Sequence, residues 1–541
     1  MHKPKKLIAA MTLVLSANVS LAQFDAQMSL ADIDGSNGVV INGVAAGHLA
    51  GYSVSYAGDV NGDGIDDVII GAPSVTPGGR TEAGACYVVF GSDSPLPNPL
   101  ELSSLNGSNG FVIEGVAAFD KLGLSVSDTG DVNGDGLDDV IIGAFAAAVG
   151  PSGFAGKAYV IFGKNSQSNF NSTFDLTTLD GDNGFVINGE ASYNGTGLSV
   201  STAGDINGDG FDDILVGAPY ADTMGNGDTN NGRIYVILGN NTGFAAELNV
   251  SNISGGDGTT GFVINGVSQD DFAGAEVSNA GDVNNDGFDD IIIGVKDVDY
   301  FRFGVEDIGS SYVVFGKDDS LSPFTNPLEL SALDGNNGFA ILGVDSFDRA
   351  GKSVSAAGDI NGDGIADLLV GASGANPTNS TSTGAGYVVY GKNESFAPVF
   401  DLYYLTANHG TVLRGESLND LLGYSISQAG DLNADGVDDL IVGARGVDSF
   451  SGRSYVVFGN TLGLSYPIDL VNLDGDSGFA INAAEAGQAS GAAVSHAGDF
   501  NADGIDDIII GAFGTDSNGS SSGSSYIVYG REKPIFKDGF E

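Results

Sequence analysis

The sequence predicts an all-β protein, specifically a seven-bladed β-propeller built from four-stranded blades. Three observations predict it. A nine-residue motif occurs seven times, with successive copies 68 to 77 residues apart. Each repeat contains four short β-type runs and no helical periodicity. The 85 glycines are placed around apolar runs, which is typical of many tight turns. Four strands per unit, repeated radially, define a propeller blade.

The nine-residue motif has the pattern D-x-N-x-D-G-x-x-D and predicts a Ca²⁺ loop. Its first copy runs from Asp59 to Asp67. Oxygen-bearing side chains stand at positions 1, 3, 5 and 9, a glycine at position 6 permits the turn, and position 7 offers a carbonyl. A helix-flanked calcium loop needs Glu at position 12, but Ile70 stands there between β-type runs, so we expect a hairpin loop. The alternative is an Asn/Asp/Gly-rich turn without metal, and the sevenfold repetition of the same ligands favours Ca²⁺.

The predicted ligands of up to seven Ca²⁺ ions, one per blade, are the side chains at positions 1, 3, 5 and 9 and the carbonyl at position 7. They are Asp59, Asn61, Asp63, Ile65 and Asp67; Asp131, Asn133, Asp135, Leu137 and Asp139; Asp205, Asn207, Asp209, Phe211 and Asp213; Asp282, Asn284, Asp286, Phe288 and Asp290; Asp359, Asn361, Asp363, Ile365 and Asp367; Asp431, Asn433, Asp435, Val437 and Asp439; and Asp499, Asn501, Asp503, Ile505 and Asp507.

Four strand types follow one another in each repeat. The Val39-Val-Ile41 type comes first, and a strand of small residues, typified by Ser53-Val-Ser55, follows. The small residues place this strand innermost, where the blades converge. After the loop comes Val68-Ile-Ile70, an apolar run expected to be buried on both faces, and then Tyr87 to Gly91. The repeats begin with the first type and end with the last. We therefore expect the N-terminal strand to complete the last blade and close the ring, whereas an open solenoid would show atypical end repeats.

The ends of the chain predict an export signal and a short tail. Residues 1–22 combine lysines, an apolar run from Leu7 and small residues before a cleavage site after Ala22, so we expect a secretory signal peptide and a secreted or cell-surface protein. A membrane anchor is the weaker alternative because the run is short and contains Ser and Asn. Residues 23–530 would form the propeller and residues 531–541 a short C-terminal tail. We expect no transmembrane segment.

Composition restricts the partners. Seventy acidic and 20 basic residues give a formal charge of −50, which disfavours nucleic acid and anionic membranes. Cys86 is the only cysteine, so no intramolecular disulfide is possible, and we expect it in the core.

The repeats resemble the FG-GAP repeats of the integrin α-subunit propeller. The resemblance rests on the Phe90-Gly91 pair, the Gly71-Ala-Pro73 triplet and the D-x-N-x-D-G-x-x-D loop, and it covers about residues 31–530. The triplet is relaxed in other repeats, for example to Gly443-Ala-Arg445. The resemblance implies a seven-bladed propeller with Ca²⁺ in the hairpin between the two inner strands of a blade.

These features predict a calcium-binding propeller that acts in adhesion or protein interaction, as a monomer, on an extracellular protein or glycan ligand. The loops between the second and third strands vary most between repeats. One of them contains Tyr300, Phe301, Arg302 and Phe303, residue types that often anchor interfaces. The alternative is that these aromatic side chains pack on their own blade. Arg445 and Arg453, two blades further on, are weaker candidates.

We expect no enzymatic activity. Beyond residue 22 the histidines are His48, His409 and His496, at non-equivalent repeat positions. No nucleophile elbow, zinc spacing or phosphate loop is present. A carbohydrate-binding propeller is the first alternative, although the chain has no Trp for sugar stacking. An extracellular hydrolase or lyase on the propeller scaffold is the less favoured alternative.

Overall fold

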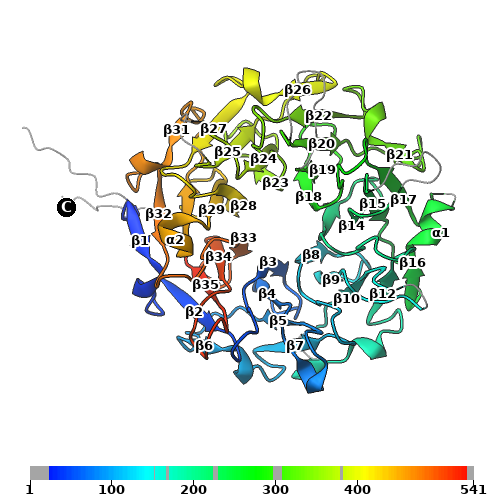
Figure 1. Ribbon diagram of the computed structural model, residues 1–541, viewed down its shortest axis with the longest axis horizontal. Helices are drawn as coiled ribbons and strands as arrows, with labels where there is room; N and C mark the ends of the chain where they lie inside the picture. The colour runs from blue at the N-terminus through cyan, green and yellow to red at the C-terminus, as the bar shows by residue number, and fades with distance from the viewer. Residues whose placement is uncertain are drawn as a thin grey trace, which may run out of the picture.

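The protein folds as a ring of β-sheets around a central axis (Figure 1). The computed structural model describes residues 23–150, 153–165, 170–222, 230–256, 258–296, 307–377 and 382–532. Within these residues there are seven sheets, each with four antiparallel strands and a fifth, short strand at its outer edge. The predicted seven-bladed propeller is therefore confirmed.

Blades 1 to 7 follow one another along the chain, and every blade has one strand at each position of its sheet. The innermost strands are β3 (Ser53–Gly58), β8 (Val126–Gly130), β13 (Val200–Gly204), β18 (Glu276–Gly281), β23 (Ser353–Gly358), β28 (Leu422–Gly430) and β33 (Ala493–Gly498). The second strands are β4 (Asp67–Ala72), β9 (Asp139–Ala144), β14 (Asp213–Ala218), β19 (Asp290–Val295), β24 (Asp367–Ala372), β29 (Asp439–Ala444) and β34 (Asp507–Ala512). The third strands are β5 (Ala85–Val89), β10 (Lys157–Ile161), β15 (Arg233–Ile237), β20 (Ser310–Val314), β25 (Ala385–Val389), β30 (Arg453–Val457) and β35 (Ser524–Val528).

The outer strands complete each sheet. The fourth strands are β7 (Gly110–Glu114), β12 (Gly184–Asn188), β17 (Gly261–Asn265), β22 (Gly338–Leu342), β27 (Gly410–Arg414), β32 (Gly478–Asn482) and β2 (Gly38–Asn42). The fifth strands are β11 (Thr173–Phe174), β16 (Glu247–Asn249), β21 (Leu328–Glu329), β26 (Val399–Asp401), β31 (Ile468–Asp469), β1 (Gln27–Ser29) and β6 (Leu100–Glu101). Helical structure in the described residues is confined to α1 (Val250–Ser254), α2 (Val447–Phe450) and single 3₁₀ turns.

The fifth strand is an addition to the predicted blade. It pairs in parallel with the fourth strand and comes from the next blade along the chain; for example β11, which lies between the third and fourth strands of blade 2, extends blade 1. Each fifth strand has only two or three residues, too few to show an alternating pattern in the sequence. Its effect is to cover the outer edge of the neighbouring blade, which would otherwise present unpaired backbone groups.

The ring closes through the N-terminal segment, as predicted. Strand β2 pairs antiparallel with β35, placing Gly38 opposite Val528, and so completes blade 7. The preceding strand β1 pairs in parallel with β32, placing Met28 opposite Ile481, and so extends blade 6. The N-terminal segment is therefore hydrogen-bonded to two blades.

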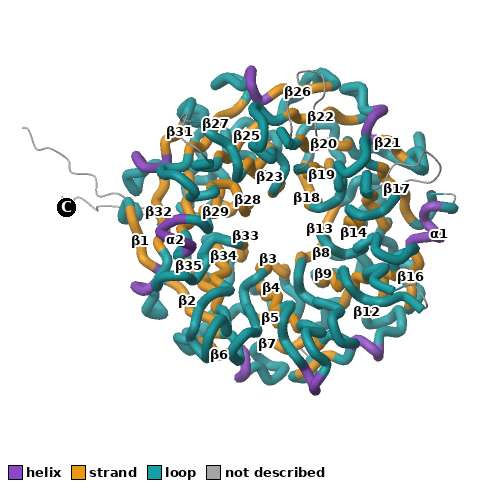
Figure 2. The backbone as a smooth tube through the Cα atoms, in the orientation of Figure 1, coloured by secondary structure: helices purple, strands orange, loops and turns teal. Residues whose placement is uncertain are grey.

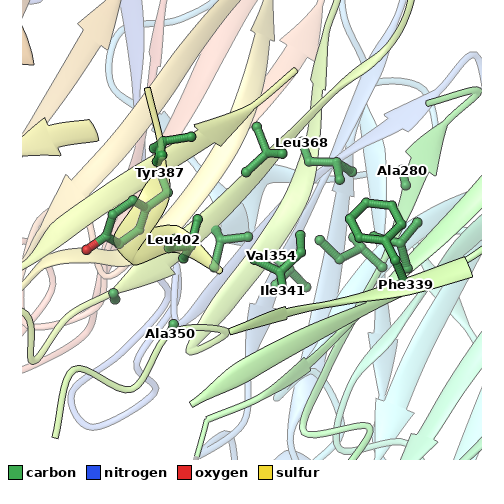
Figure 3. Packing of buried hydrophobic residues seen from close by; sticks show 14 of the residues in the cluster. Ala280, Phe339, Ile341, Ala350, Val354, Leu368, Tyr387 and Leu402 are labelled. Atoms are coloured by element: carbon green, nitrogen blue, oxygen red, sulfur yellow. The ribbon is translucent and has the colours of Figure 1, made fainter. Parts of the chain in front are cut away.

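The core lies between neighbouring blades. The second strands are buried along their whole length, as the continuous apolar runs predict. Figure 3 shows one interface, where Phe339 and Ile341 of blade 4 pack with Val354, Leu368 and Tyr387 of blade 5. The strands of small residues lie innermost around the axis (Figure 2). Their small side chains allow seven blades to approach one another there.

Two sets of side-chain hydrogen bonds join the innermost parts of adjacent blades. In the first, the aspartate at loop position 8 accepts the N–H of the position-1 aspartate in the preceding blade; Asp138 Oδ2 lies 2.7 Å from Asp59 N. Equivalent bonds are made by Asp212, Asp289, Asp438, Asp506 and Asp66. In the second, a serine Oγ accepts the N–H of a valine or isoleucine in the next blade, as Ser53 does from Val126 at 3.1 Å; Ser125, Ser199, Ser353 and Ser425 do the same.

The joint between blades 4 and 5 departs from both patterns. Ala366 stands at loop position 8 of blade 5, and Glu276 stands where the blade-4 serine would be. Among the described residues this joint instead contains an ion pair, with Lys352 Nζ 3.2 Å from Glu276 Oε1.

Candidate calcium loops and the central channel

The seven loops lie where the resemblance places them, in the hairpins between the first and second strands. In blade 1 the loop connects β3 to β4. Asp59 Oδ1 accepts the N–H of Asp63 at 3.0 Å and its Oδ2 accepts the N–H of Gly64 at 2.8 Å. Asp63 Oδ1 accepts the N–H of Ile65 at 3.0 Å. Hydrogen bonds from the loop backbone to the carboxylates at positions 1 and 5 thus hold the loop in its conformation.

The position-9 aspartate is the deepest group of each loop. Asp67 is fully buried, and its Oδ1 accepts the N–H of Gly91, the glycine of the Phe-Gly pair, at 3.0 Å. A Cβ at Gly91 would lie 2.2 Å from the carbonyl oxygen of Asp66, which explains why glycine is required there. The same bond, 2.8–2.9 Å long, occurs in the other blades, to Asp139, Asp213, Asp290, Asp367, Asp439 and Asp507. The Phe-Gly pair is therefore part of the loop's support.

Burial raises the pKa of these position-9 carboxyl groups. Desolvation raises the pKa of Asp67 well above its usual range, and it raises that of Asp367 to about 8 and that of Asp507 to about 9. The neighbouring carboxylates at positions 1 and 5 act in the same direction. A cation bound in the loop would favour the ionised form of all three groups.

The donor chemistry of the loops fits a hard divalent cation. Within the described residues, no group of three or more His, Cys, Asp or Glu side chains is arranged to hold a metal ion. However, three oxygen atoms at predicted ligand positions are buried and accept no hydrogen bond: Asn284 Oδ1, Asn433 Oδ1 and Asp507 Oδ2. An unpartnered buried oxygen is costly, and a bound cation would satisfy it. The carboxylate and amide oxygens are the ligand types that Ca²⁺ prefers.

The innermost strands carry a variable residue three positions before each loop. The seven residues are Tyr56, Asp128, Thr202, Asn279, Ala356, Gln428 and His496. The Tyr56 ring stacks on the His496 ring with centroids 4.4 Å apart, and its hydroxyl donates to Asp66 Oδ1 at 3.0 Å. Burial raises the pKa of Asp128 to about 7 and lowers that of His496 to about 4. Sequence reasoning missed this set, although register within the repeat would have identified it.

The face opposite the predicted calcium loops carries exposed aromatic side chains in strained backbone. Phe119, Tyr193 and Phe347 lie in the loops entering the innermost strands and are 51%, 70% and 53% exposed. Their φ values are 69°, 70° and 67°, a region that bulky residues rarely adopt. Phe154 and Phe450, in the loops between second and third strands, are also about half exposed and have φ values of 54° and 68°. The residues at these loop tips are held in place by hydrogen bonds between the two sets of loops, for example from Tyr193 N to Phe154 O at 3.0 Å.

Several predicted features lie outside the described residues. They are the signal peptide, the loop residues Tyr300, Phe301, Arg302 and Phe303, and the tail beyond residue 532. Arg453 pairs with Glu416 at 2.9 Å, whereas Arg445 lies at the mouth of the central channel. Cys86 is buried, as expected. No helix among the described residues is both long and apolar enough to cross a bilayer.

Comparison with known proteins identifies the repeats. The model of the FG-GAP repeat matches residues 50–89, 196–237, 350–389 and 422–457. The phosphatidylinositol-glycan-specific phospholipase D of Rattus norvegicus is 30% identical over 168 residues, which is 31% of this chain and 18% of that protein. The Dictyostelium discoideum protein of the same name is 24% identical over 58% of this chain and 31% of its own length. Integrin alpha-5 of Xenopus laevis is 32% identical over 32% of this chain and 15% of its own length. The matched region thus spans between 15% and 31% of the length of these three relatives.

These relatives overturn the prediction that the protein is not an enzyme, because proteins named as phospholipases match the chain in several organisms. The prediction relied on the absence of short catalytic motifs. In a propeller, polar groups from different blades meet at the axis, as Tyr56 and His496 do, although 440 positions separate them in the numbering. Such a set leaves no short motif in the sequence.

Proposed function

We propose that this seven-bladed propeller, four segments of which match the FG-GAP repeat and part of which is similar to integrin alpha-5, is a secreted or cell-surface recognition module. In this proposal each blade binds one Ca²⁺ ion, and the face opposite the calcium loops binds an extracellular protein or glycan. The calcium loops lie at the hairpins that hold the two inner strands of each blade, so the ions would stabilise the scaffold. The opposite face would carry the recognition.

The exposed aromatic residues of that face are the observation on which the proposal depends. Backbone in the left-handed region costs about 1–3 kcal/mol for each non-glycine residue. Phe119, Tyr193 and Phe347 bear this cost while exposing at least half of their surface. Folding gains little from such side chains, whereas rigid exposed aromatic groups favour interfaces.

Calcium binding is supported by the buried, unpartnered oxygens of Asn284, Asn433 and Asp507. The test is calorimetric titration of metal-free protein with Ca²⁺, together with thermal unfolding in Ca²⁺ and in chelator. We expect close to seven ions and a large increase in Tm. The Asp507→Asn variant should bind one ion fewer, whereas the exposed Asp182→Asn control should bind the same number. Unchanged Tm and no bound Ca²⁺ would refute the metal assignment.

Recognition is tested by binding the labelled protein to arrays of glycans and of extracellular matrix proteins. The informative variant replaces Phe119, Tyr193 and Phe347 with serine. The matched control replaces Tyr403, Tyr404 and Leu462, which are 67%, 71% and 93% exposed and lie outside those entry loops. Binding should fall at least tenfold in the first variant and remain in the control. Equal loss in both variants, or loss in neither, would contradict the proposed face.

A second candidate function is hydrolytic, and two observations favour it. The first is the set of relatives named phosphatidylinositol-glycan-specific phospholipase D. The second is Asp128, a carboxyl group that stands outside the calcium-ligand positions and whose pKa of about 7 suits proton transfer near neutral pH. In this proposal Asp128 would act at the axis beside Tyr56 and His496.

This candidate is tested by release of a glycosylphosphatidylinositol-anchored reporter from vesicles. Asp128→Asn should reduce release at least 100-fold without changing Ca²⁺ stoichiometry, while Asp182→Asn should leave it unchanged. Absence of release by the wild-type protein, or equal release by Asp128→Asn, would exclude this role for Asp128.

A further inference from the structure

The channel opens into a cavity on the face opposite the calcium loops. Its volume is about 280 Å³, and each of the seven blades contributes to its lining. The lining residues come mainly from the beginnings of the innermost strands and from the residues that follow the second strands. Its charged groups are Lys352, Arg445 and Glu276. Two cations and one anion meet at this mouth, although acidic residues outnumber basic ones 70 to 20 in the whole chain.

The two cations lie against one aromatic ring. The guanidinium carbon of Arg445 is 3.9 Å from the centroid of Tyr424, and Lys352 Nζ is 4.6 Å from the same centroid. Lys352 Nζ also contacts Glu276 Oε1 at 3.2 Å. Tyr52 also lines the mouth, with its ring 5.3 Å from that of Phe513. Lys352 and Glu276 balance each other, and Arg445 leaves a net charge of +1.

Arg445 has donors that the protein does not use. Its Nε is buried and has no hydrogen-bond partner, and within the described residues the side chain forms no ion pair. Within the described residues no carboxylate balances the charge of this guanidinium, and an anionic ligand would do so. The contact with Tyr424 fixes the plane of the guanidinium, and Lys352 is held by Glu276. Both cations are therefore oriented before any ligand arrives.

The propeller itself does not require a cation at this position. Five of the other six blades have an uncharged residue directly after the second strand, and blade 4 has a lysine; the residues are Pro73, Phe145, Pro219, Ser373 and Phe513 in blades 1, 2, 3, 5 and 7, and Lys296 in blade 4. These five blades have the same order of strands in the sheet as blade 6. The positive charge of Arg445 thus has no structural role that these five blades share.

We propose that the channel mouth is a binding site for an oxyanion, a carboxylate or phosphate group that Arg445 holds through its two terminal nitrogens, with Lys352 beside it. A planar guanidinium fork matches two oxygens of one such group. Tyr52 and Phe513 would contact the apolar part of the ligand. The oxyanion would be carried by a small acid or by an acidic side chain of a protein that covers the mouth.

The test compares calorimetric titrations of the whole protein in Ca²⁺ at constant ionic strength. The probes are acetate, methylphosphonate and a blocked Gly-Asp-Gly tripeptide, with choline as the cationic control. Binding of the free anions alone would identify small acids as the source, and preference for the tripeptide would identify a protein side chain. Either result supports an oxyanion site, whereas no binding of any anion, or binding of choline, would overturn it.

Three variants separate the site from general electrostatics. Arg445→Gln should weaken anion binding at least tenfold, because it removes the net charge and the guanidinium donors. Glu276→Gln should strengthen binding about threefold to tenfold, because it removes the competing carboxylate from Lys352. The control Arg80→Gln lowers the net charge equally at a surface pair with Glu114 and should leave affinity unchanged. Equal effects of Arg445→Gln and Arg80→Gln, or weaker binding in Glu276→Gln, would refute the assignment. The Tm of each variant is measured in parallel, and a folded Arg445→Gln with wild-type affinity refutes it equally.

Discussion

The bond between loop position 8 and the preceding blade can be tested by truncating Asp138 to alanine. Asp138 Oδ2 accepts the N–H of Asp59 at 2.7 Å, and a Cβ at Gly58 would lie 2.3 Å from the Asp138 carboxyl carbon. The truncation therefore removes a charge-assisted bond at a tightly packed contact. Such bonds contribute about 1.5–3 kcal/mol. Burial raises the pKa of Asp138, which offsets part of this stabilisation, so we expect a loss of about 1.5–2 kcal/mol.

The expected change in Tm follows from the size of the protein. Unfolding entropy of about 2.1 cal/mol/K per residue gives about 1 kcal/mol/K for a ring of roughly 500 residues. Asp138→Ala should therefore lower Tm by about 1.5–2 °C in differential scanning calorimetry. Asp138→Asn keeps an oxygen acceptor without the charge and should lower Tm by about half as much. Asp182→Ala, at an exposed turn, should cause no change.

Calcium titration of the same variants distinguishes an inter-blade bond from a metal ligand. Position 8 is not a predicted ligand, so Asp138→Ala should retain the wild-type Ca²⁺ stoichiometry. A loss of one ion would mean that position 8 belongs to the metal site. A Tm within 0.5 °C of wild type would mean that this bond contributes little to holding blades 1 and 2 together, and the stabilising role of position 8 would be refuted.

Three further predictions concern the same loops. Ala366→Asp should add the missing bond to blade 4 and raise Tm in calorimetry by about 1.5–2 °C, since the equivalent bond of Asp138 contributes about 1.5–2 kcal/mol; a decrease would contradict it. Gly91→Ala should lower Tm by at least about 2 °C and remove one Ca²⁺ ion in titration, because its Cβ would clash with the Asp66 carbonyl beside the Asp67 bond. In metal-free protein, Asp367 and Asp507 have folded pKa values of about 8 and 9, raised above the unfolded value of 3.8. Their contribution to the free energy of unfolding is thus fully present below pH 4 and is lost as the pH rises to 9. The Tm of the metal-free protein should therefore fall between pH 4 and pH 9. Over the same range, the increase in Tm caused by adding Ca²⁺ should become larger. A gain that is constant with pH would contradict this linkage.

The repeats made the scaffold predictable from sequence alone. Alternation and apolar runs indicated the four main strands, and the phase of the first and last repeats indicated how β2 closes the ring. Fifth strands such as Leu100–Glu101 were not predictable, because two residues carry no periodicity and the pairing partner belongs to another repeat. The bond between Asp59 and Asp138 joins residues 79 positions apart. Within the sequence of a single loop, nothing indicates that the side chain at position 8 bonds to the neighbouring blade.

The candidate sites at the axis were still harder to predict from the sequence. Seven blades each supply one side chain, so the residues that meet are spaced by a whole repeat. The useful signal is a departure from the consensus at one register position. Arg445 is such a departure, because five of the other six blades have an uncharged residue at this position. Its significance required the structure, which brings it within 3.9 Å of the Tyr424 ring.

The joint between blades 4 and 5 connects the scaffold to the channel mouth. Among the described residues, this joint has neither the serine bond nor the position-8 aspartate bond, because Glu276 and Ala366 replace the residues that make them. A serine at position 276 would stabilise the ring more, because its hydroxyl oxygen would accept a backbone N–H of the next blade, as the equivalent serines of other blades do. Glu276 instead holds Lys352, and Lys352 lies against the same Tyr424 ring as Arg445. At this joint the residues therefore form the charged cluster of the mouth and do not form the hydrogen bonds that join the other blades. Such a loss of a stabilising pattern is expected where residues serve a binding site.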